Sequence, residues 1–144
     1  MKRIGKVARR YKFFFLNPYQ DVRFSYCPKC ASKTKLRKVP LVIQIESQQP
    51  MVINKSCRYC PSCDLLIAHR DEVEKQLSSL IGQHQSVESS NIIGIIEKSE
   101  WRRNTSESMK TTEIFDGLYV FKQVLRFEPS TWIKLNVQWK GIES

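Results

Sequence analysis

The cysteines are the residues of this chain whose type and spacing point most directly to chemistry. Five cysteines occur in 144 residues, in two groups: CPKC at residues 27–30 and CRYCPSC at residues 57–63. A turn with two residues between its cysteines can direct both sulfurs at one tetrahedral metal ion about 2.3 Å away. Two such turns supply four ligands and close the coordination sphere. The spacing therefore predicts a structural metal site and no catalytic residues.

The residues between the two groups predict the element that brings them together. Segments 39–46 and 51–57 alternate in polarity or are rich in β-branched residues, and the polar segment 47–50 separates them as a turn. An antiparallel hairpin returns its second strand to the end where the first strand began. We therefore expect a hairpin between the two groups of cysteines.

The expected register of this hairpin has a consequence for the first group. A turn centred between residues 48 and 49 places Cys57 opposite Pro40. Cys30 then lies well before the first strand. Residues 31–38 have to form a loop or bulge if Cys30 is to reach Cys60.

The sequences Cys27-Pro28-Lys29-Cys30 and Cys60-Pro61-Ser62-Cys63 resemble the CPxC turns of the zinc ribbon class. The resemblance covers residues 27–63 and favours Cys60 with Cys63, over Cys57 with Cys60, as the second pair. It implies a zinc ion (Zn2+) at the base of a β-hairpin, but no activity. Ribbon turns often carry glycine after the second cysteine, whereas Ala31 and Asp64 stand there in this chain. The implied ligands are Cys27, Cys30, Cys60 and Cys63.

Other cysteine chemistries fit the sequence less well. Cys57, Cys60 and Cys63 form a run like part of an iron–sulfur site, but the usual C-x-x-x-C-P completion is missing. Thiol redox enzymes place one CxxC pair at a helix start within a βαβ pattern, which surrounds neither pair here. A zinc deaminase needs an H-x-E element, which neither His69 nor His84 begins. Buried reduced cysteines without a metal are the simplest alternative.

Two residues near the cysteine pairs have more than one interpretation. Cys57 can be a core thiol, an alternate ligand or a reactive site, of which the core thiol is commonest. His69 can replace a cysteine as ligand, although a lone histidine near a strand end is more often a surface or hydrogen-bonded residue. Nothing in the sequence marks a catalytic cysteine.

The positive charge of the chain is concentrated near its beginning. The formal net charge is +10. Residues 1–40 hold twelve lysines and arginines against the single acid Asp21, whereas residues 41–80 have a net charge of −1 and residues 81–144 of 0. This asymmetry favours an anionic partner, either nucleic acid, with RNA favoured, or an acidic protein complex. The candidate nucleic-acid contacts are Lys2, Arg3, Lys6, Arg9, Arg10, Lys12, Lys29, Lys33, Lys35, Arg37 and Lys38.

Aromatic residues are interleaved with the bases between residues 9 and 26. Basic groups neutralise phosphates and aromatic faces stack on unpaired bases, so the combination suits single-stranded or structured RNA. The alternative to RNA binding has equal physical support: residues 13–16 form a strand that covers the hairpin, and the neighbouring charges are simply solvated.

Further elements are expected after the second group of cysteines. A third strand is predicted over residues 65–68. A helix is expected to begin at Asp71, with an approximate capping box from Asp71 to Glu74. The helix ends at Gly82, and its apolar stripe is formed by residues 73, 77, 80 and 81. Strands are predicted over residues 92–96, 118–127 and 133–140, although the spacing of residues 118–127 also permits a helix.

These elements predict an α+β, mainly β fold. A zinc ribbon hairpin with a short helix is followed by a small antiparallel sheet or partial barrel. The expected organisation is a basic aromatic segment (1–26), the ribbon with its helix (27–82), a linker (83–90) and a small β unit (91–144).

The same observations lead to an expected function. Neither a membrane span nor a secretory signal is found, and paired thiols suit a reducing compartment, so we expect a cytoplasmic location. The leading expectation is a non-enzymatic, zinc-stabilised nucleic-acid-binding protein. The alternative is a zinc ribbon adaptor or an auxiliary subunit of a larger complex. No small-molecule substrate is predicted.

Overall fold

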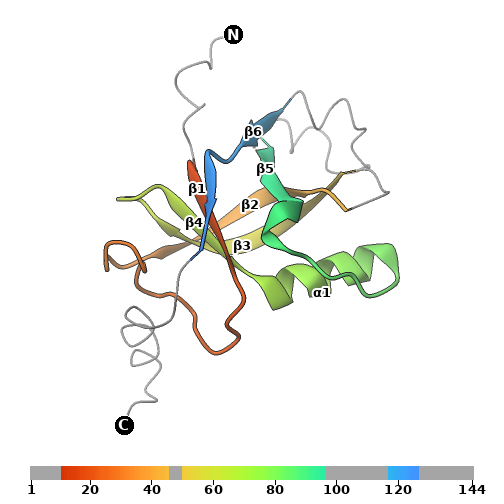
Figure 1. Cartoon of the computed structure of the whole chain (residues 1–144), viewed down its shortest axis with the longest axis horizontal. Coiled ribbons are helices and arrows are strands. Elements are labelled where there is room, and N and C mark those ends of the chain that lie inside the picture. The colour runs from red at the N-terminus through yellow and green to blue at the C-terminus, as the bar shows by residue number, and fades with distance from the viewer. Residues whose placement is uncertain (1–10, 46–49, 97–116, 127–144) are drawn as a thin grey trace.

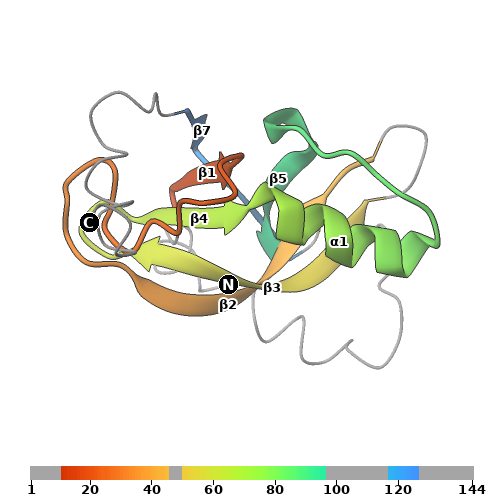
Figure 2. The same ribbon diagram turned by 90° about the horizontal axis from the view of Figure 1, so that it is seen from below.

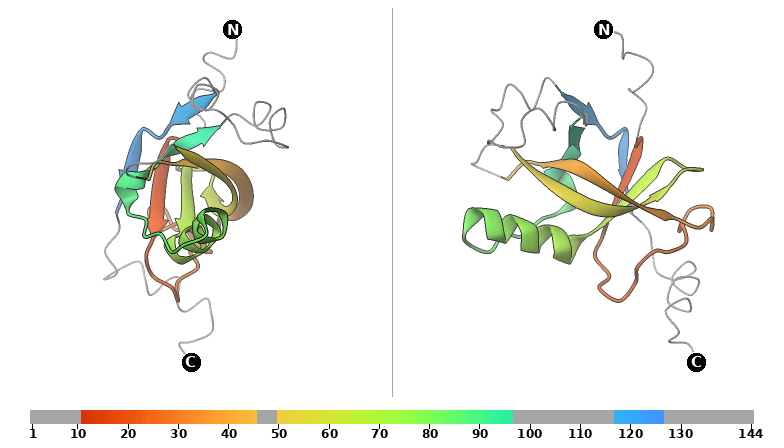
Figure 3. Two further views of the ribbon diagram at one scale, coloured as in Figure 1. Left: turned by 90° about the vertical axis from the view of Figure 1, so that its right-hand side faces the viewer. Right: turned by 180° about the vertical axis from the view of Figure 1, so that it is seen from behind.

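The computed structural model describes residues 11–45, 50–96 and 117–126, and one curled sheet organises them (Figure 1). The sheet is mixed, with strand order β6-β5-β2-β3-β4-β1-β7, and it forms a half-barrel that Figure 3 shows end-on. The mainly β character expected from the sequence is confirmed. The elements are β1 (Phe13–Asn17), β2 (Lys35–Ile43), β3 (Met51–Cys60), β4 (Leu65–His69), α1 (Arg70–Ile81), the 3-10 helix η1 (Ser89–Asn91), β5 (Ile92–Ile96), β6 (Leu118–Val120) and β7 (Gln123–Leu125).

β2 and β3 form the long antiparallel hairpin expected between the cysteine groups, but in a different register. Cys57 lies opposite Arg37, and Pro40 lies opposite Asn54. The predicted pairing of Cys57 with Pro40 is therefore wrong by three positions. Because β2 already begins at Lys35, residues 35–38 are strand where a loop was predicted, and only residues 31–34 connect Cys30 to β2.

The buried face of the hairpin explains this register. In the predicted register, Leu41 would face Ser56 and Ile43 would face Asn54. The observed pairing instead places Ile53 opposite Leu41 and Met51 opposite Ile43. A shift by an odd number of residues exchanges the two faces of a strand, so burial of the apolar set selects one register.

β4 and β1 extend the sheet beyond the hairpin. β4 pairs antiparallel with β3, which confirms the predicted third strand, and β1 pairs in parallel with β4. Phe14, Phe15 and Leu16 of β1 are buried. These side chains belong to the fold, as the strand interpretation of residues 13–16 expects, and the two rings are not exposed for stacking on bases.

A bent segment at residues 118–125 closes the curl of the sheet. β6 and β7 lie at opposite ends of the strand order, yet only Phe121 and Lys122 separate them. The Phe121 ring stacks on Phe14 with centroids 4.8 Å apart. The backbone N–H of Phe121 donates to the Ile93 carbonyl at 3.1 Å, and the backbone N–H of Lys122 donates to the Lys12 carbonyl at 2.7 Å. The strand predicted over residues 118–127 is thus interrupted by a bend that joins the two edges.

Helix α1 follows β4 directly, and its beginning differs from the prediction. Its N-cap is His69, which makes no side-chain capping bond. The predicted capping box of Asp71 and Glu74 is wrong, because the Glu74 carboxylate accepts the Val87 N–H at 2.8 Å. Gly82 ends the helix as predicted, with a left-handed φ of 90°.

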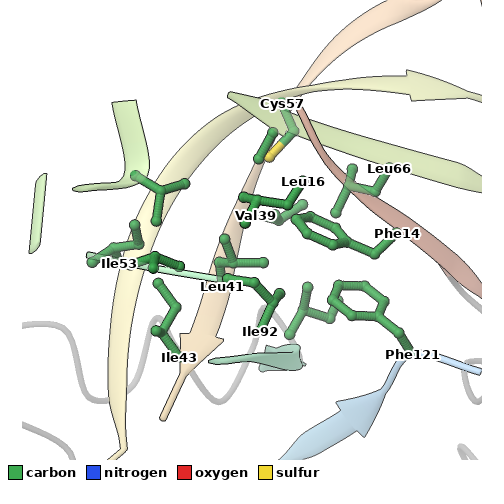
Figure 4. Packing of buried hydrophobic residues seen from close by; sticks show 14 of the residues in the cluster. Phe14, Leu16, Val39, Leu41, Ile43, Ile53, Cys57, Leu66, Ile92 and Phe121 are labelled. Atoms are coloured by element: carbon green, nitrogen blue, oxygen red, sulfur yellow. The ribbon is translucent and has the colours of Figure 1, made fainter. Parts of the chain in front are cut away.

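The main core fills the inside of the half-barrel. Val73 and Leu77 of α1, together with Val87, pack into it, whereas Leu80 of the predicted stripe is 61% exposed. Figure 2 shows α1 beside β3, and Figure 4 shows the close packing of the core. The strand residues labelled in Figure 4 include Phe14, Leu16, Val39, Leu41, Ile43, Ile53, Cys57, Leu66 and Ile92.

Strands from both sides of segment 83–90 share this one sheet. The predicted strand at residues 92–96 is confirmed as β5, which pairs with β2. Among the described residues, one sheet therefore stands where a hairpin followed by a further small sheet was expected. The predicted strand at residues 133–140 and the basic residues 2, 3, 6, 9 and 10 lie outside the described residues. In the part of the chain that the structure describes, no helix combines the length and the apolar character that a membrane-spanning segment needs.

Gly94 is the site of a test of this architecture. A Cβ at Gly94 of β5 would overlap the backbone carbonyl of Tyr119 in β6. We expect Gly94→Ala to lower the free energy of unfolding by about 1 to 3 kcal/mol, because the two strands would have to separate. Urea unfolding measures this loss.

Gly82→Ala is the control, because nothing lies within 4 Å of its Cβ position and only its left-handed φ opposes the change. We expect it to cost about 1 kcal/mol. A Gly94→Ala chain as stable as the wild type would contradict the close approach of β5 and β6.

Candidate metal centre

The first cysteine turn, residues 27–30, is held by backbone hydrogen bonds. The Cys27 N–H donates to the Ser32 carbonyl and the Ala31 N–H donates to the Cys27 carbonyl, both at 2.8 Å. The Lys29 N–H donates to the Cys27 Sγ at 3.3 Å. The turn therefore presents its sulfurs from a fixed backbone, with Cys27 buried and Cys30 exposed.

The second cysteine turn, residues 60–63, joins β3 to β4. Cys60 is the last residue of β3 and pairs with Leu65, the first residue of β4. The chain reverses within the four residues between them, which brings Cys63 back toward Cys60. Strand pairing on both sides thus fixes the second pair of sulfurs.

The two turns meet, and all four sulfur atoms lie within 4.8 Å of one another. The Sγ atoms of Cys27 and Cys63 are 4.0 Å apart, and those of Cys30 and Cys60 are 3.5 Å apart. Four ligands at about 2.3 Å from a tetrahedral ion are separated from each other by about 3.8 Å. The predicted convergence of these cysteines is confirmed, and the cluster could hold a metal ion.

The cluster combines buried and exposed thiols. Burial raises the pKa of Cys27 well above its ordinary range. Burial is also the main cause that raises the pKa of Cys63 to about 11, and a hydrogen bond with Cys30 is the second cause. Hydrogen bonding by Ser32 lowers the pKa of Cys30 to about 6. Neighbouring thiolates repel each other, so a bound cation is what would allow all four sulfurs to ionise together.

Ala31 and Asp64, which stand where ribbon turns often have glycine, both adopt left-handed backbone conformations. Their φ angles are 65° and 58°. This conformation costs an ordinary residue about 1 to 2 kcal/mol, and aspartate tolerates it better than most. The turns therefore keep the backbone shape that favours glycine, although neither position carries one.

Asp64 has a further role that the sequence analysis missed. Its carboxylate accepts the N–H groups of Tyr11 and Lys12, both at 2.9 Å, and the Tyr59 hydroxyl at 2.7 Å. Burial is the main cause that raises the pKa of Tyr59, and the hydrogen bond to Asp64 is the second cause. Asp64 thus ties the start of β1 to the second cysteine turn. The sequence signal for this role was an aspartate directly after a CPxC turn, at a position where glycine is usual.

Cys57 and His69 lie outside the cluster. Cys57 is three residues before Cys60 on β3, so it lies on the opposite face, in the main core. Its Sγ donates to the Lys55 carbonyl at 3.5 Å, and burial raises its pKa to about 12. The His69 Nε2 lies 3.1 Å from the Val22 carbonyl. Cys57 is a core thiol and His69 a hydrogen-bonded residue, and neither supplies a ligand atom to the cluster.

The candidate basic residues that the structure describes lie mainly on its surface. Lys12, Lys29, Lys33, Lys35 and Lys38 are exposed. The Lys29 Nζ lies 4.7 Å from the centre of the Phe13 ring. The half-buried Arg37 lies 5.0 Å from the centre of the Tyr59 ring and donates to the Tyr11 hydroxyl at 3.4 Å. Arg37 is therefore engaged within the fold, whereas most of the lysines extend into solvent.

Comparison with known protein families, with characterised proteins and with solved structures found no match to this chain. Its class is therefore defined by its own geometry. It is a mainly β protein in which a four-cysteine cluster, able to hold a metal ion, joins two turns at the end of one hairpin.

Substitutions at the two left-handed positions separate backbone strain from side-chain bonding. We expect Ala31→Gly to stabilise the chain by up to about 1 kcal/mol, because it relieves strain alone. Asp64→Gly relieves the same strain but loses three hydrogen bonds to a carboxylate, so we expect a net loss of about 2 kcal/mol. Urea unfolding of both variants compares the two effects. Equal stabilisation by both changes would contradict the role of Asp64.

Proposed function

We propose that the four-cysteine cluster binds one structural zinc ion. The observation that carries this proposal is the convergence of four sulfurs within 4.8 Å, from two turns thirty residues apart in the chain. Thiolate ligands favour zinc over the hard cations that prefer oxygen. Four protein ligands leave no open position for a substrate, so the ion would stabilise the fold and would not take part in a reaction.

The spacing of the sulfurs also favours a single ion over an iron–sulfur cluster. A cluster places several iron and sulfide atoms between its cysteines, which requires the Sγ atoms to stand further apart than around one tetrahedral ion. Separations of 3.5 and 4.0 Å between Sγ atoms suit one ion. The position of Cys57 in the main core removes the C-x-x-C-x-x-C run as a ligand set.

A zinc ion at this place would act on a small core of its own. Cys27 and Cys60 pack with Phe24, Leu65 and Ile67 in a cluster separate from the main core. The ion would hold residues 27–30 against the end of β3 and add its binding free energy to folding. The loop and the sheet would then behave as one rigid platform.

We further propose that this platform binds nucleic acid, with RNA favoured. Lys29, Lys33, Lys35 and Lys38 are exposed on the first cysteine turn, the residues after it and the start of β2. Within the described part of the chain, the ion pairs are Lys55 with Glu72 and Arg70 with Glu74, so these four lysines have no acidic partner there. Ammonium groups without an acidic partner, beside a rigid turn, can neutralise phosphates without reading a sequence.

A second candidate function is docking of an acidic protein. Leu36 stands between Lys35 and Arg37 on β2, and its side chain is 65% exposed. An exposed apolar residue among basic ones suits a protein interface better than a phosphate backbone. The adaptor function is therefore the alternative to nucleic-acid binding.

Serine substitutions test the metal assignment. We expect Cys30→Ser and Cys60→Ser to abolish binding of one zinc ion per chain and to lower the melting temperature, because each removes one of four ligands. Cys57→Ser is the matched control on the same strand and should retain the metal. Elemental analysis and thermal unfolding of the three variants measure both effects. Equal loss of zinc in all three would refute the ligand set.

Salt dependence tests the nucleic-acid proposal. Each phosphate contact on a single strand contributes about 0.7 to the slope of log affinity against log salt concentration. We expect a variant with glutamine at Lys29, Lys33, Lys35 and Lys38 to bind single-stranded RNA more weakly and with a smaller slope. Lys75→Gln on α1 is the control, and fluorescence anisotropy at several salt concentrations is the measurement.

The same assay discriminates between the two candidate functions. A wild-type chain with no affinity for RNA at low salt would exclude nucleic-acid binding. Salt-tolerant capture of an acidic protein through Leu36 would support the adaptor instead, because a packed interface is less sensitive to screening.

A further inference from the structure

A groove of about 300 Å³ lies on the same face of the sheet as Cys60. Strand pairing accounts for its walls. Arg58 of β3 pairs with Ile67 of β4, and His69 of β4 pairs with Asn17 of β1. Alternate residues of a strand share a face, so Arg58 and Cys60 face the same way, as do Ile67 and His69. The groove is open to solvent and is also lined by Arg23, from the segment between β1 and Cys27.

Arg23 and Arg58 are the two arginines that line this groove. Neither Arg23 nor Arg58 forms an ion pair within the described ranges. Glu72 also lines the groove, but its carboxylate is bound to the Nζ of the buried Lys55 at 2.7 Å. The hydrogen bond from Lys55 holds the pKa of Glu72 below its usual range, with smaller contributions from His69 and Arg23. The one acid in the groove is thus already offset by a lysine.

The segment that carries Arg23 is fixed beside the sheet. The Val22 carbonyl accepts the Asn17 side-chain amide at 2.8 Å and lies 3.1 Å from the His69 Nε2. A carbonyl only accepts, so this nitrogen of His69 carries a proton. The Val22 side chain itself is buried in the small core beside the cysteine cluster. Arg23 therefore stands on an anchored backbone, which reduces the entropy lost when a ligand binds.

From this groove we propose that Arg23 and Arg58 bind a phosphate group. A guanidinium group presents planar paired donors that match two phosphate oxygens. Asp71 and Glu72 already complement the N-terminus of α1, so the attraction comes from the arginines and not from the helix. Ile67 and Leu36 add apolar wall that suits the group attached to the phosphate. The phosphate belongs either to an RNA backbone or to a small phosphorylated molecule, since both present the same oxygens.

Inorganic phosphate is the probe for this proposal. It is titrated into the zinc-loaded full chain while backbone amide shifts are followed by NMR. We expect saturable shifts at Arg23, Arg58, Ser56 and His69. The double variant Arg23→Gln/Arg58→Gln should bind phosphate about tenfold more weakly or worse, because charge-assisted hydrogen bonds are lost. Arg58→Lys keeps the charge but loses the paired donors, so it should bind with intermediate affinity.

The matched control is the double variant Lys75→Gln/Lys122→Gln. Both lysines are exposed and lie outside the groove. This variant loses two positive charges, as the arginine double variant does. Its phosphate affinity should stay close to that of the wild type. Wild-type shifts that never saturate, or equal weakening in the two double variants, would overturn the proposal. A dispersed spectrum of each variant shows that it has folded.

Competition then identifies the source of the phosphate. Displacement of inorganic phosphate by single-stranded RNA supports a backbone phosphate in the groove. Displacement by a nucleoside monophosphate without displacement by RNA supports a small phosphorylated molecule. If only the nucleoside monophosphate displaces phosphate, the groove is a phosphate site whether or not the exposed lysines of the first cysteine turn bind RNA. The proposal of RNA binding by these lysines and the proposal of a phosphate site in the groove therefore succeed or fail separately.

Discussion

Four sulfur atoms held within 4.8 Å of one another are the constraint on which much of this structure depends. Two of them, on Cys27 and Cys60, are buried, where an isolated thiolate would be costly. A divalent cation at the centre would convert mutual repulsion into four bonds between the two turns, which the β2–β3 hairpin and the small core already bring together. The hairpin brings the sulfurs together, and the proposed ion would keep them there.

The influence of the second cysteine turn reaches across the sheet through Asp64. Its carboxylate holds the backbone of Tyr11 and Lys12. The carbonyl of Lys12 in turn accepts the N–H of Lys122 in the bend that joins β6 to β7. One chain of hydrogen bonds therefore links the cysteine cluster to the segment that closes the half-barrel. Loosening the turn would loosen the start of β1 and the closing bend together.

The two faces of the sheet have separate roles. The inner face, with residues such as Leu41 and Cys57, is filled by the main core and by α1. The other face carries the cysteine cluster at one end of β3 and the groove with Arg58 two residues before Cys60. Strand alternation produces this division, because neighbouring residues point to opposite sides. Basic side chains lie both on the exposed cysteine turn and in the groove, and both proposals assign these side chains an anionic partner.

The sequence by itself determined the local features: the two CPxC turns, the hairpin between them, the stop at Gly82 and the strand at residues 92–96. Each depends on the spacing or turn chemistry of adjacent residues. Only the tertiary structure decided the hairpin register, the parallel pairing of β1 with β4, the bend at Phe121 and the contacts of Asp64. These features depend on which distant surfaces are buried against each other, and a local pattern of polarity is compatible with several such arrangements.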